Sequence, residues 1–179
     1  GGFCRGEGCS AAVIGVADDV GAKRRIVLCG SAIRQDGRSA SLTAPSGQAQ
    51  QGLLHGALQD ASLEAQAIST YEAHGTGTAL GDPIEAGSRT AGLAAQARRA
   101  GPLTCDGTKA NLGHGESTAG VSGLLRLVFG LAAGEAPPNA PLRVINPHVR
   151  SATRGSPCAM PCQLSCSSRA SDVWASPSD

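Results

Sequence analysis

The stretch that decides the fold is EAHGTGTALGDPIE, which spans residues 72–85. Residues 68–73 are a compact candidate strand that ends at His74, and a turn of alternating Gly and Thr follows (the first histidine turn, residues 74–78). Asp82 and the proline after it predict the start of a helix. Asp82 would be the cap, and the proline would lie in the first turn, where its missing N–H costs nothing. We expect this helix to run to about residue 100.

A second stretch of similar design is KANLGH at residues 109–114 (the second histidine turn). Residues 103–108 are a candidate strand that ends at Lys109. A helix is predicted over 117–133, because small residues on its early turns are followed by an apolar run. Gly134 and a pair of prolines then stop it. Each histidine turn therefore follows a strand and precedes a helix.

The rest of the chain continues this alternation. Residues 11–16 and 25–33 are apolar candidate strands, and 46–63 repeats its apolar residues at helical spacing, with Ser46 or a neighbour as its cap. The order strand, strand, helix, strand, helix, strand, helix predicts an α/β fold with parallel strands. In such sheets functional groups collect beyond the carboxyl ends of the strands, where both histidine turns fall.

Composition and charge exclude several classes of protein. The 179 residues are 41% hydrophobic and 16% charged, which argues against a disordered polyelectrolyte. The formal net charge of +1 gives no case for nucleic acid or an anionic membrane as a partner, and no apolar run has the length of a membrane helix. The chain opens without Met and without a signal-peptide pattern. We expect it to begin inside a longer product that is soluble and intracellular, in the cytoplasm or a plastid.

The last part of the chain and the cysteines point away from a metal site. Residues 151–179 are rich in Ser, Cys and Pro and are predicted to be a disordered tail, which places a boundary near 150. Cys158, Cys162 and Cys166 recur at four-residue steps without the paired cysteines and fourth ligand of a zinc site, so we expect reduced thiols there and no metal. The other cysteines are interpreted as buried reduced thiols: Cys4, Cys9, Cys29 and Cys105.

The candidate functional residues are two imidazoles, an amine and a carboxylate: His74, His114, Lys109 and Glu85. Two histidines can transfer protons and donate hydrogen bonds to an oxyanion. No nucleophile accompanies them. A structural interpretation also exists for each: a histidine can satisfy a strand end, and Lys109 and Glu85 can form a structural ion pair.

Several collinear motifs together resemble the later half of a β-ketoacyl synthase domain of type I modular or iterative polyketide synthases. The resemblance runs from the start of the chain to about residue 149. It rests on GFCRGEGC at 2–9, QDGRS at 35–39, LTAPSG at 42–47, EAHGTGT at 72–78, GDPIE at 81–85, KANLGH at 109–114, AGVSGLL at 119–125, PPN at 137–139 and NPH at 146–148.

The resemblance implies part of a thiolase-like fold, with layers ordered α/β/α/β/α, and a decarboxylative Claisen condensation. In that reaction a cysteine takes an acyl group, and a malonyl-type thioester loses carbon dioxide and attacks it. By resemblance His74 and His114 match the two active-site histidines, whose N–H groups would stabilise the enolate oxygen. Lys109 matches the active-site lysine and Glu85 its usual partner.

The resemblance also implies the partners. Thr76 and Thr78 match positions near the phosphopantetheine path and could donate to its amides. No cofactor would be bound by the domain itself, because the substrates arrive on the phosphopantetheine of an acyl carrier protein. Further expected partners are the missing N-terminal half of the ketosynthase and a second copy in a homodimer.

The departures from the family pattern leave three hypotheses open. No position of this chain matches the nucleophilic cysteine, so we expect the chain alone to be inactive in condensation. It could belong to a condensing enzyme, persist as a non-catalytic module that binds carrier protein or complements another chain, or act as a malonyl-thioester decarboxylase.

Overall fold

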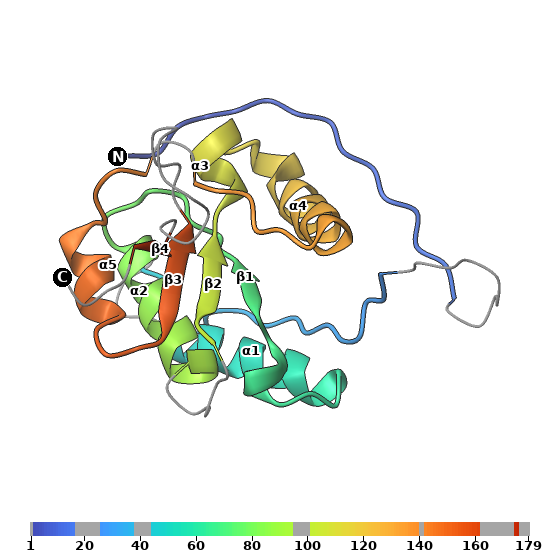
Figure 1. The fold of residues 1–179 in the computed structure, drawn as a ribbon, viewed down its shortest axis with the longest axis horizontal. Helices are drawn as coiled ribbons and strands as arrows, with labels where there is room; N and C mark the ends of the chain where they lie inside the picture. The colour runs from blue at the N-terminus through green and yellow to red at the C-terminus, as the bar shows by residue number, and fades with distance from the viewer. Residues whose placement is uncertain are drawn as a thin grey trace.

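A computed structural model describes residues 2–16, 26–37, 44–94, 101–139, 142–161 and 174–175 of the chain. Its centre is a four-stranded sheet in the order β1-β2-β3-β4 (Figure 1). β1 pairs with β2 and β2 with β3 in parallel, while β3 and β4 are antiparallel. The strands are β1 (Thr70–Glu72), β2 (Leu103–Asp106), β3 (Cys158–Pro161) and β4 (Trp174–Ala175).

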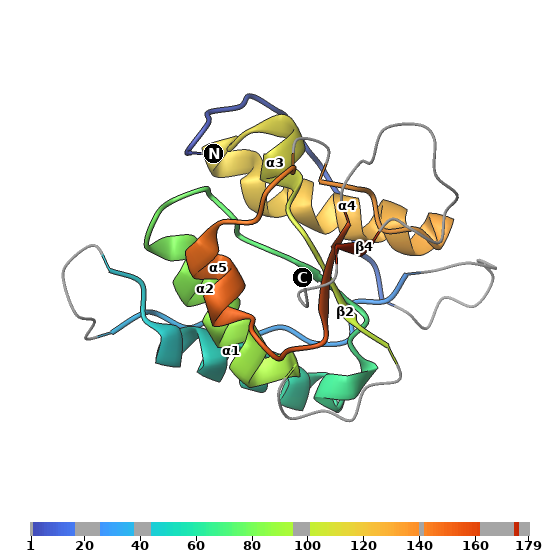
Figure 2. The ribbon, with the colours of Figure 1, turned by 60° about the vertical axis from the view of Figure 1, so that its left-hand side comes forward.

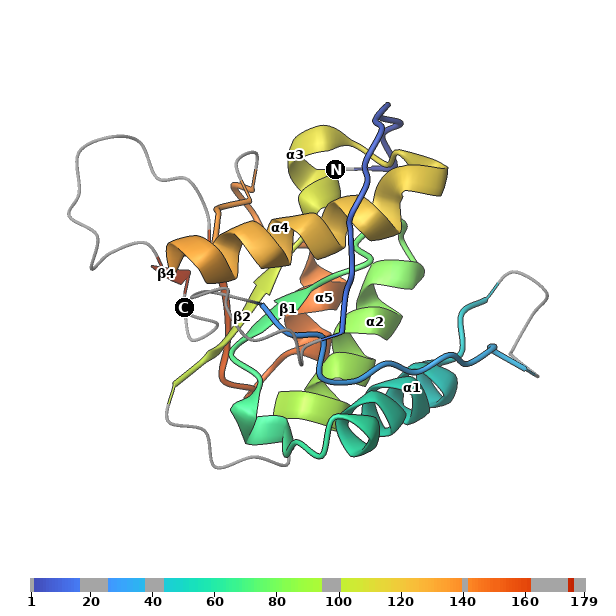
Figure 3. The ribbon, with the colours of Figure 1, turned by 90° about the vertical axis from the view of Figure 1, so that its right-hand side faces the viewer.

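Helices cover both faces of this sheet. Figure 3 shows α4 crossing in front of the strands with α2 and α5 behind them, and Figure 2 shows α1 beside α2 on that second side. The α-helices are α1 (Gly47–Asp60), α2 (Gly81–Arg89), α3 (Thr108–Leu112), α4 (Ala119–Ala133) and α5 (Pro147–Ala152). Single turns η1 (Ala65–Ala67) and η3 (Glu116–Thr118) are 3₁₀, and η2 (Thr90–Ala94) is a π-helical continuation of α2.

The two faces of the sheet differ in chemistry because successive strand residues point to opposite sides. On the side of α1 and η2, Leu103 is fully buried and packs with Leu93, Cys105 and Cys158. On the side of α4, the pleat instead presents buried polar side chains, including Asp106. The apolar core therefore lies between the sheet and α1, and a charged cluster lies beneath α4.

Local signals in the sequence correctly predict α1, α2, α4, β1 and β2, whereas Thr108–Leu112 form the short helix α3 where the sequence predicted a strand end and a turn. The Ser46 side chain accepts a hydrogen bond from the Ala49 N–H at the start of α1, and Gly134 ends α4 in a left-handed conformation with φ 71°. The α2 cap differs from the prediction. Leu80 occupies the cap position, and Asp82 lies inside the helix and accepts a hydrogen bond from the Gly77 N–H at 3.1 Å. The expected extension of this helix over 95–100 lies outside the described residues.

Two predictions of strands are wrong. Residues 11–16 and 26–33 are extended but join no strand of the described sheet, and their large apolar side chains are exposed, with Val13 at 103%. Figure 1 shows residues 2–16 passing α3 and α4 and then leaving the body of the fold. Residue 25 lies outside the described part.

The segment after residue 150 also differs from the expected disordered tail. Helix α5 continues to Ala152, and residues 158–161 form β3 beside β2, with Leu103 opposite Cys158. Composition suggested irregular structure here, but pairing with a buried strand supplies backbone hydrogen bonds that the local sequence does not reveal. Residues 162–173 and 176–179 lie outside the described residues, and with them Cys162 and Cys166.

The prediction of buried cysteines holds only in part. Cys105 is buried in β2, whereas Cys4, Cys9 and Cys29 are exposed. Cys158, expected in the disordered tail, is a buried free thiol in β3.

Candidate active site

The structure brings the two histidine turns together at the carboxyl ends of β1 and β2. The rings of His74 and His114 lie with their centroids 5.8 Å apart and their planes nearly perpendicular, at 88°. Because β1 and β2 are parallel, their carboxyl ends share one edge of the sheet, and the turns that follow them are neighbours.

The first histidine turn is fixed by Glu85 from α2. Its Oε1 accepts hydrogen bonds from the His74 N–H at 2.6 Å and the Tyr71 hydroxyl at 3.1 Å, and its Oε2 accepts one from the Gly75 N–H at 2.9 Å. Gly75 and Gly77 adopt φ values of 47° and 78°, where a side chain would be strained. Burial, followed by the Glu85 charge, raises the pKa of Tyr71 well above its usual value, so Tyr71 stays a neutral donor.

The second histidine turn is held by the N-terminal segment of the chain. The His114 N–H donates to the Cys4 carbonyl at 2.7 Å, and the Gly6 N–H donates to the His114 carbonyl at 3.0 Å. Gly113 has φ 79°, and a Cβ on it would lie 2.8 Å from the Arg5 carbonyl oxygen. The sequence did not indicate that this N-terminal segment pairs with His114.

The tautomer of His114 follows from one hydrogen bond. The Glu116 N–H donates to His114 Nδ1 at 2.9 Å, so the Nδ1 of the neutral ring is an acceptor and the ring proton lies on Nε2. His114 can therefore offer Nε2–H to a ligand.

His74 is held in its neutral form by its surroundings. Burial is the main cause of its lowered pKa, and the Lys109 charge lowers the pKa further, against an opposing effect of Glu85. A neutral His74 at pH 7 offers one N–H donor without carrying a charge.

The expected ion pair between Lys109 and Glu85 is absent among the ion pairs of the described residues. Lys109 lies in α3, and both oxygens of Glu85 are occupied by groups of the first histidine turn and by Tyr71. Backbone N–H groups of a tight turn are strong competitors for a carboxylate, which sequence spacing could not show.

Thr76 and Thr78 lie on the same turn, with their hydroxyl oxygens 3.3 Å apart. Thr78 Oγ1 also accepts from the Gly81 N–H at 3.2 Å, which supports the first turn of α2. A cavity of about 440 Å³ is lined by His74, Thr76 and Glu85 together with residues of α1 and α2. A second cavity of about 190 Å³ is lined by Lys109 and residues of α3, α4 and the N-terminal segment.

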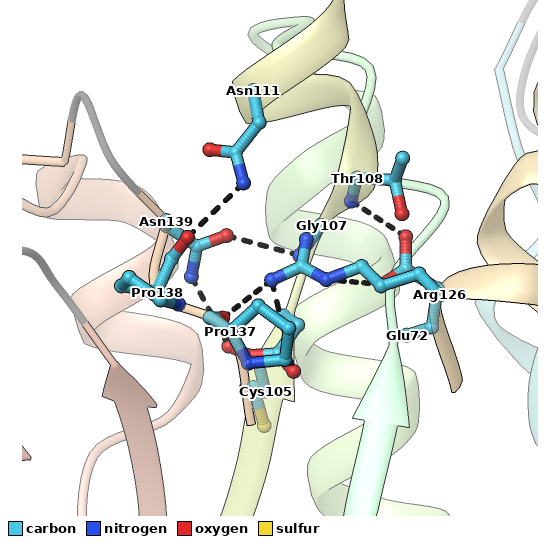
Figure 4. Close-up of polar contacts among 10 residues, drawn as sticks. Glu72, Cys105, Gly107, Thr108, Asn111, Arg126, Pro137, Pro138 and Asn139 are labelled. Carbon is cyan, nitrogen blue, oxygen red and sulfur yellow. Dashed lines mark hydrogen bonds and ion pairs between the residues drawn. The ribbon is translucent and has the colours of Figure 1, made fainter. Parts of the chain in front are cut away.

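Sequence reasoning missed a buried polar cluster beneath the second turn, built from Glu72, Arg126 and Asn139 (Figure 4). The ion pair between Arg126 Nε and Glu72 Oε2 spans 3.8 Å, and their side chains are only 9% and 8% exposed. The signal in the sequence was Arg126 itself, a charged residue inside the apolar run of α4. A charge on an otherwise apolar face is rarely buried without a partner.

Metal ligation and membrane insertion find no support in the described part of the chain. Its residues contain no group of three or more His, Cys, Asp or Glu side chains placed to hold a metal ion. None of the described helices is both long and apolar enough to cross a membrane.

Comparison with known proteins identifies the family. The family model "Beta-ketoacyl synthase, C-terminal domain" matches residues 26–143. The chain is 42% identical over 157 residues to the highly reducing polyketide synthase cm3B of Cordyceps militaris, a match that covers 86% of this chain and 6% of that protein. It is 46% identical over 125 residues to erythronolide synthase EryA2 of Saccharopolyspora erythraea, covering 69% of this chain and 3% of the relative.

Solved structures agree with this assignment. An oxazolomycin ketosynthase domain of Streptomyces albus JA3453 superimposes with a TM-score of 0.68 at 27% identity, covering 74% of this chain and 23% of that one. A ketosynthase from module 6 of the bacillaene synthase of Bacillus subtilis 168 gives 0.63 at 30% identity, covering 68% and 22%. The chain thus belongs to the beta-ketoacyl synthase family, matches its C-terminal domain over residues 26–143 and has part of the thiolase-like α/β fold. It spans less than a tenth of the polyketide synthases that it matches.

Proposed function

We propose that this chain is the enolate-stabilising part of a β-ketoacyl synthase, which condenses acyl and malonyl-type thioesters carried on acyl carrier protein. The observation that carries the proposal is the perpendicular pair of His74 and His114 rings at 5.8 Å, with the proton of His114 on Nε2. N–H donors on two neighbouring rings can together bind an oxyanion that forms during the reaction.

The chemistry begins with loss of carbon dioxide from the malonyl thioester. The bond between the α-carbon and the carboxylate breaks, and its electron pair passes into the thioester as an enolate whose oxygen accepts from both histidines. The enolate carbon then attacks the acyl thioester, forms the new carbon–carbon bond and releases the nucleophilic thiolate. Neutral imidazoles suit this step because they stabilise the developing charge without giving up a proton at the outset.

Lys109 and Glu85 then have different tasks. The Lys109 charge helps to keep His74 neutral, since it lowers the pKa of that ring. Glu85 anchors the first histidine turn, with one oxygen on the His74 N–H and the other on the Gly75 N–H. Both residues therefore act on the histidines and need no contact with the substrate.

The carrier arm would reach the histidines along the first turn. Thr76 lines the larger cavity together with His74, and the Thr78 hydroxyl contacts the Thr76 hydroxyl. We assign these hydroxyls to the amides of phosphopantetheine, which arrives with the carrier protein and is not a resident cofactor.

The nucleophile would come from the rest of the ketosynthase domain. The chain spans 22–23% of the ketosynthase structures that it matches, and acyl transfer requires a thiolate that no residue of this site supplies. The apolar side chains exposed on Val13, Ile14, Val27 and Ile33 suit burial against the remaining part of the domain or against a homodimer partner. We propose that the ketosynthase-like sequence ends near residue 150, while the folded sheet continues through β3 at 158–161.

A reconstitution experiment tests this function. The chain is mixed with a separately expressed remainder of a related ketosynthase, acyl carrier protein and malonyl carrier protein, and the β-ketoacyl product is measured by mass spectrometry. We expect product only from the mixture, and none when His114→Ala replaces the wild-type chain. Product from the chain alone would contradict the assigned source of the nucleophile. Preferential binding of holo- over apo-carrier protein without any product would instead support a non-catalytic carrier-binding module.

A further inference from the structure

Glu72 joins the two histidine turns directly. It is the last residue of β1, two positions before His74, and its Oε1 accepts a hydrogen bond from the Thr108 N–H at 2.6 Å. Thr108 opens α3 immediately before Lys109. The Glu72 carboxylate at the end of β1 thus binds the Thr108 backbone, which leads into the second histidine turn.

Arg126 holds the same carboxylate from α4. Its Nε lies 3.8 Å from Glu72 Oε2, and its Nη2 lies 3.9 Å from Asp106 Oδ2 and donates to the Pro137 carbonyl. Figure 4 shows the guanidinium extending from α4 toward Glu72 and the Pro137 segment. Loss of the partner of a buried ion pair is strongly destabilising, so Arg126 supports the Glu72 carboxylate in the position where it accepts from Thr108.

Gly123 provides the space in which Glu72 lies. It is buried on α4, and a Cβ at this position would lie 3.1 Å from Glu72 Cγ. A methyl group there would press on the Glu72 stem without removing any polar group. Gly123 and Arg126 lie one turn apart on α4, so the same helix both makes room for the Glu72 side chain and supplies its ion-pair partner.

Asn139 holds the adjacent peptide from the other side. Its Oδ1 accepts from the Gly107 N–H at 3.0 Å, and its Nδ2 donates to the Cys105 carbonyl at 3.4 Å. The amides of Gly107 and Thr108, the last two before Lys109, are therefore both bound by side chains from other parts of the chain (Figure 4). Because the Gly107 and Thr108 amides are both held, Lys109 and the second histidine turn have little freedom to move.

We propose that Glu72, held by Arg126, is a positioning residue that sets the second histidine turn, with Lys109 and His114, against His74. This role rests on the proposed function, because its purpose is to align the two donors for the enolate oxygen. Glu72 touches neither the substrate nor the reacting atoms in this role, and it acts through Thr108.

Two substitutions of equal charge isolate the hydrogen bond. Glu72→Gln removes the charge but keeps an oxygen for the Thr108 N–H, whereas Glu72→Met keeps a similar length and offers no acceptor. Any purely electrostatic effect of losing the carboxylate is common to both variants. Gly123→Ala is the third variant, since it displaces Glu72 while improving helix propensity, and it serves if Glu72→Met does not fold.

The first measurement is amide hydrogen exchange at Thr108 in the full chain. We expect exchange at least about tenfold faster in Glu72→Met than in Glu72→Gln, as for loss of one hydrogen bond. Gly123→Ala should accelerate it by a smaller factor. Equal exchange in the Gln and Met variants would overturn the proposal.

The second measurement is the pKa of His74 by NMR titration, which a merely structural role would not change. The titratable groups that influence His74 are Lys109 from α3, Glu85 and Asp82 from α2, and His114. If Glu72→Met releases Lys109, the His74 pKa should rise relative to Glu72→Gln, because the Lys109 charge lowers it. Faster Thr108 exchange with an unchanged His74 pKa would reduce Glu72 to a structural residue and overturn the positioning role.

Neither Thr108 exchange nor the His74 titration depends on catalysis, so a third measurement addresses activity. Carbon dioxide release from malonyl carrier protein, measured on the same variants, should be lower for Glu72→Met than for Glu72→Gln. If the wild-type chain mixed with the remainder of the ketosynthase forms no β-ketoacyl product while exchange and titration behave as expected, the proposed function fails and the positioning of the turns stands.

Discussion

Replacing Asp106 with asparagine should stabilise the folded chain at neutral pH. Asp106 ends β2 with its side chain only 3% exposed, next to Glu72, and the pair faces the single positive charge of Arg126. With both carboxylates ionised, the buried cluster carries one unbalanced negative charge. The asparagine has the same shape and leaves Arg126 paired with Glu72 alone.

The pKa of Asp106 gives the size of the effect. Burial, opposed by Arg126 and reinforced by Glu72, raises that pKa from 3.8 to about 6. The folded chain thus binds more protons than the unfolded chain between these values, and stability from this group falls as the pH rises through 6. This rise in the Asp106 pKa corresponds to about 3 kcal/mol of stability, present well below pH 3.8 and lost above pH 6.

Urea denaturation followed by circular dichroism tests this reasoning at pH 4 and pH 8. We expect Asp106→Asn to be more stable than wild type by about 1–3 kcal/mol at pH 8, with the advantage reduced by about 2 kcal/mol at pH 4. Glu116→Gln is the control, because that carboxylate is 61% exposed and pairs with an exposed Arg5, so its effect should be small at both values. A less stable Asp106→Asn at pH 8 would refute the reasoning, since the Arg126 ion pair would then outweigh the cost of burial.

Three further substitutions test separate parts of the structure. Leu103→Ala, in the fully buried core, should cost about 2–5 kcal/mol in urea denaturation, whereas Leu112→Ala, at a side chain 67% exposed, should cost far less; equal costs would contradict the assigned core. Gly113→Ala should accelerate amide exchange in residues 4–6, because its φ of 79° and the 2.8 Å approach of a backbone carbonyl leave no room for a methyl, and Gly120→Ala, which faces open space, should not. Glu85→Gln should destabilise the chain by about 1–3 kcal/mol and accelerate exchange in the first histidine turn, since an amide NH₂ would replace one acceptor oxygen; unchanged exchange would remove its anchoring role.

The parts of the fold that follow from local chemistry could be read from the sequence. The Ser46 cap, the apolar spacing of α1 and α4 and the left-handed Gly134 are decided by neighbours within a few residues. The positions of His74 and Lys109 just beyond β1 and β2 also follow, because parallel strands bring their carboxyl ends together.

The remaining parts depend on partners distant in sequence. Residues 11–16 and 26–33 have the composition of strands, but a strand also needs a neighbour to accept its hydrogen bonds, and the described residues provide none. Residues 158–161 lack a strand pattern yet pair with β2. The partners of Glu85 also depend on contacts in space: the first histidine turn and Tyr71 bind its oxygens, and Lys109, expected from the sequence, does not.

The most direct measurement of the central claim is carbon dioxide release from malonyl carrier protein by the wild-type chain or its histidine variants, each mixed with the remainder of the ketosynthase. His74→Ala and His114→Ala should each lower the rate by about 100-fold or more, as expected for loss of one oxyanion donor. His55→Ala, which changes an exposed histidine in α1, should behave as wild type. Rates that are unchanged in the first two variants would contradict the assignment of this pair to the enolate oxygen.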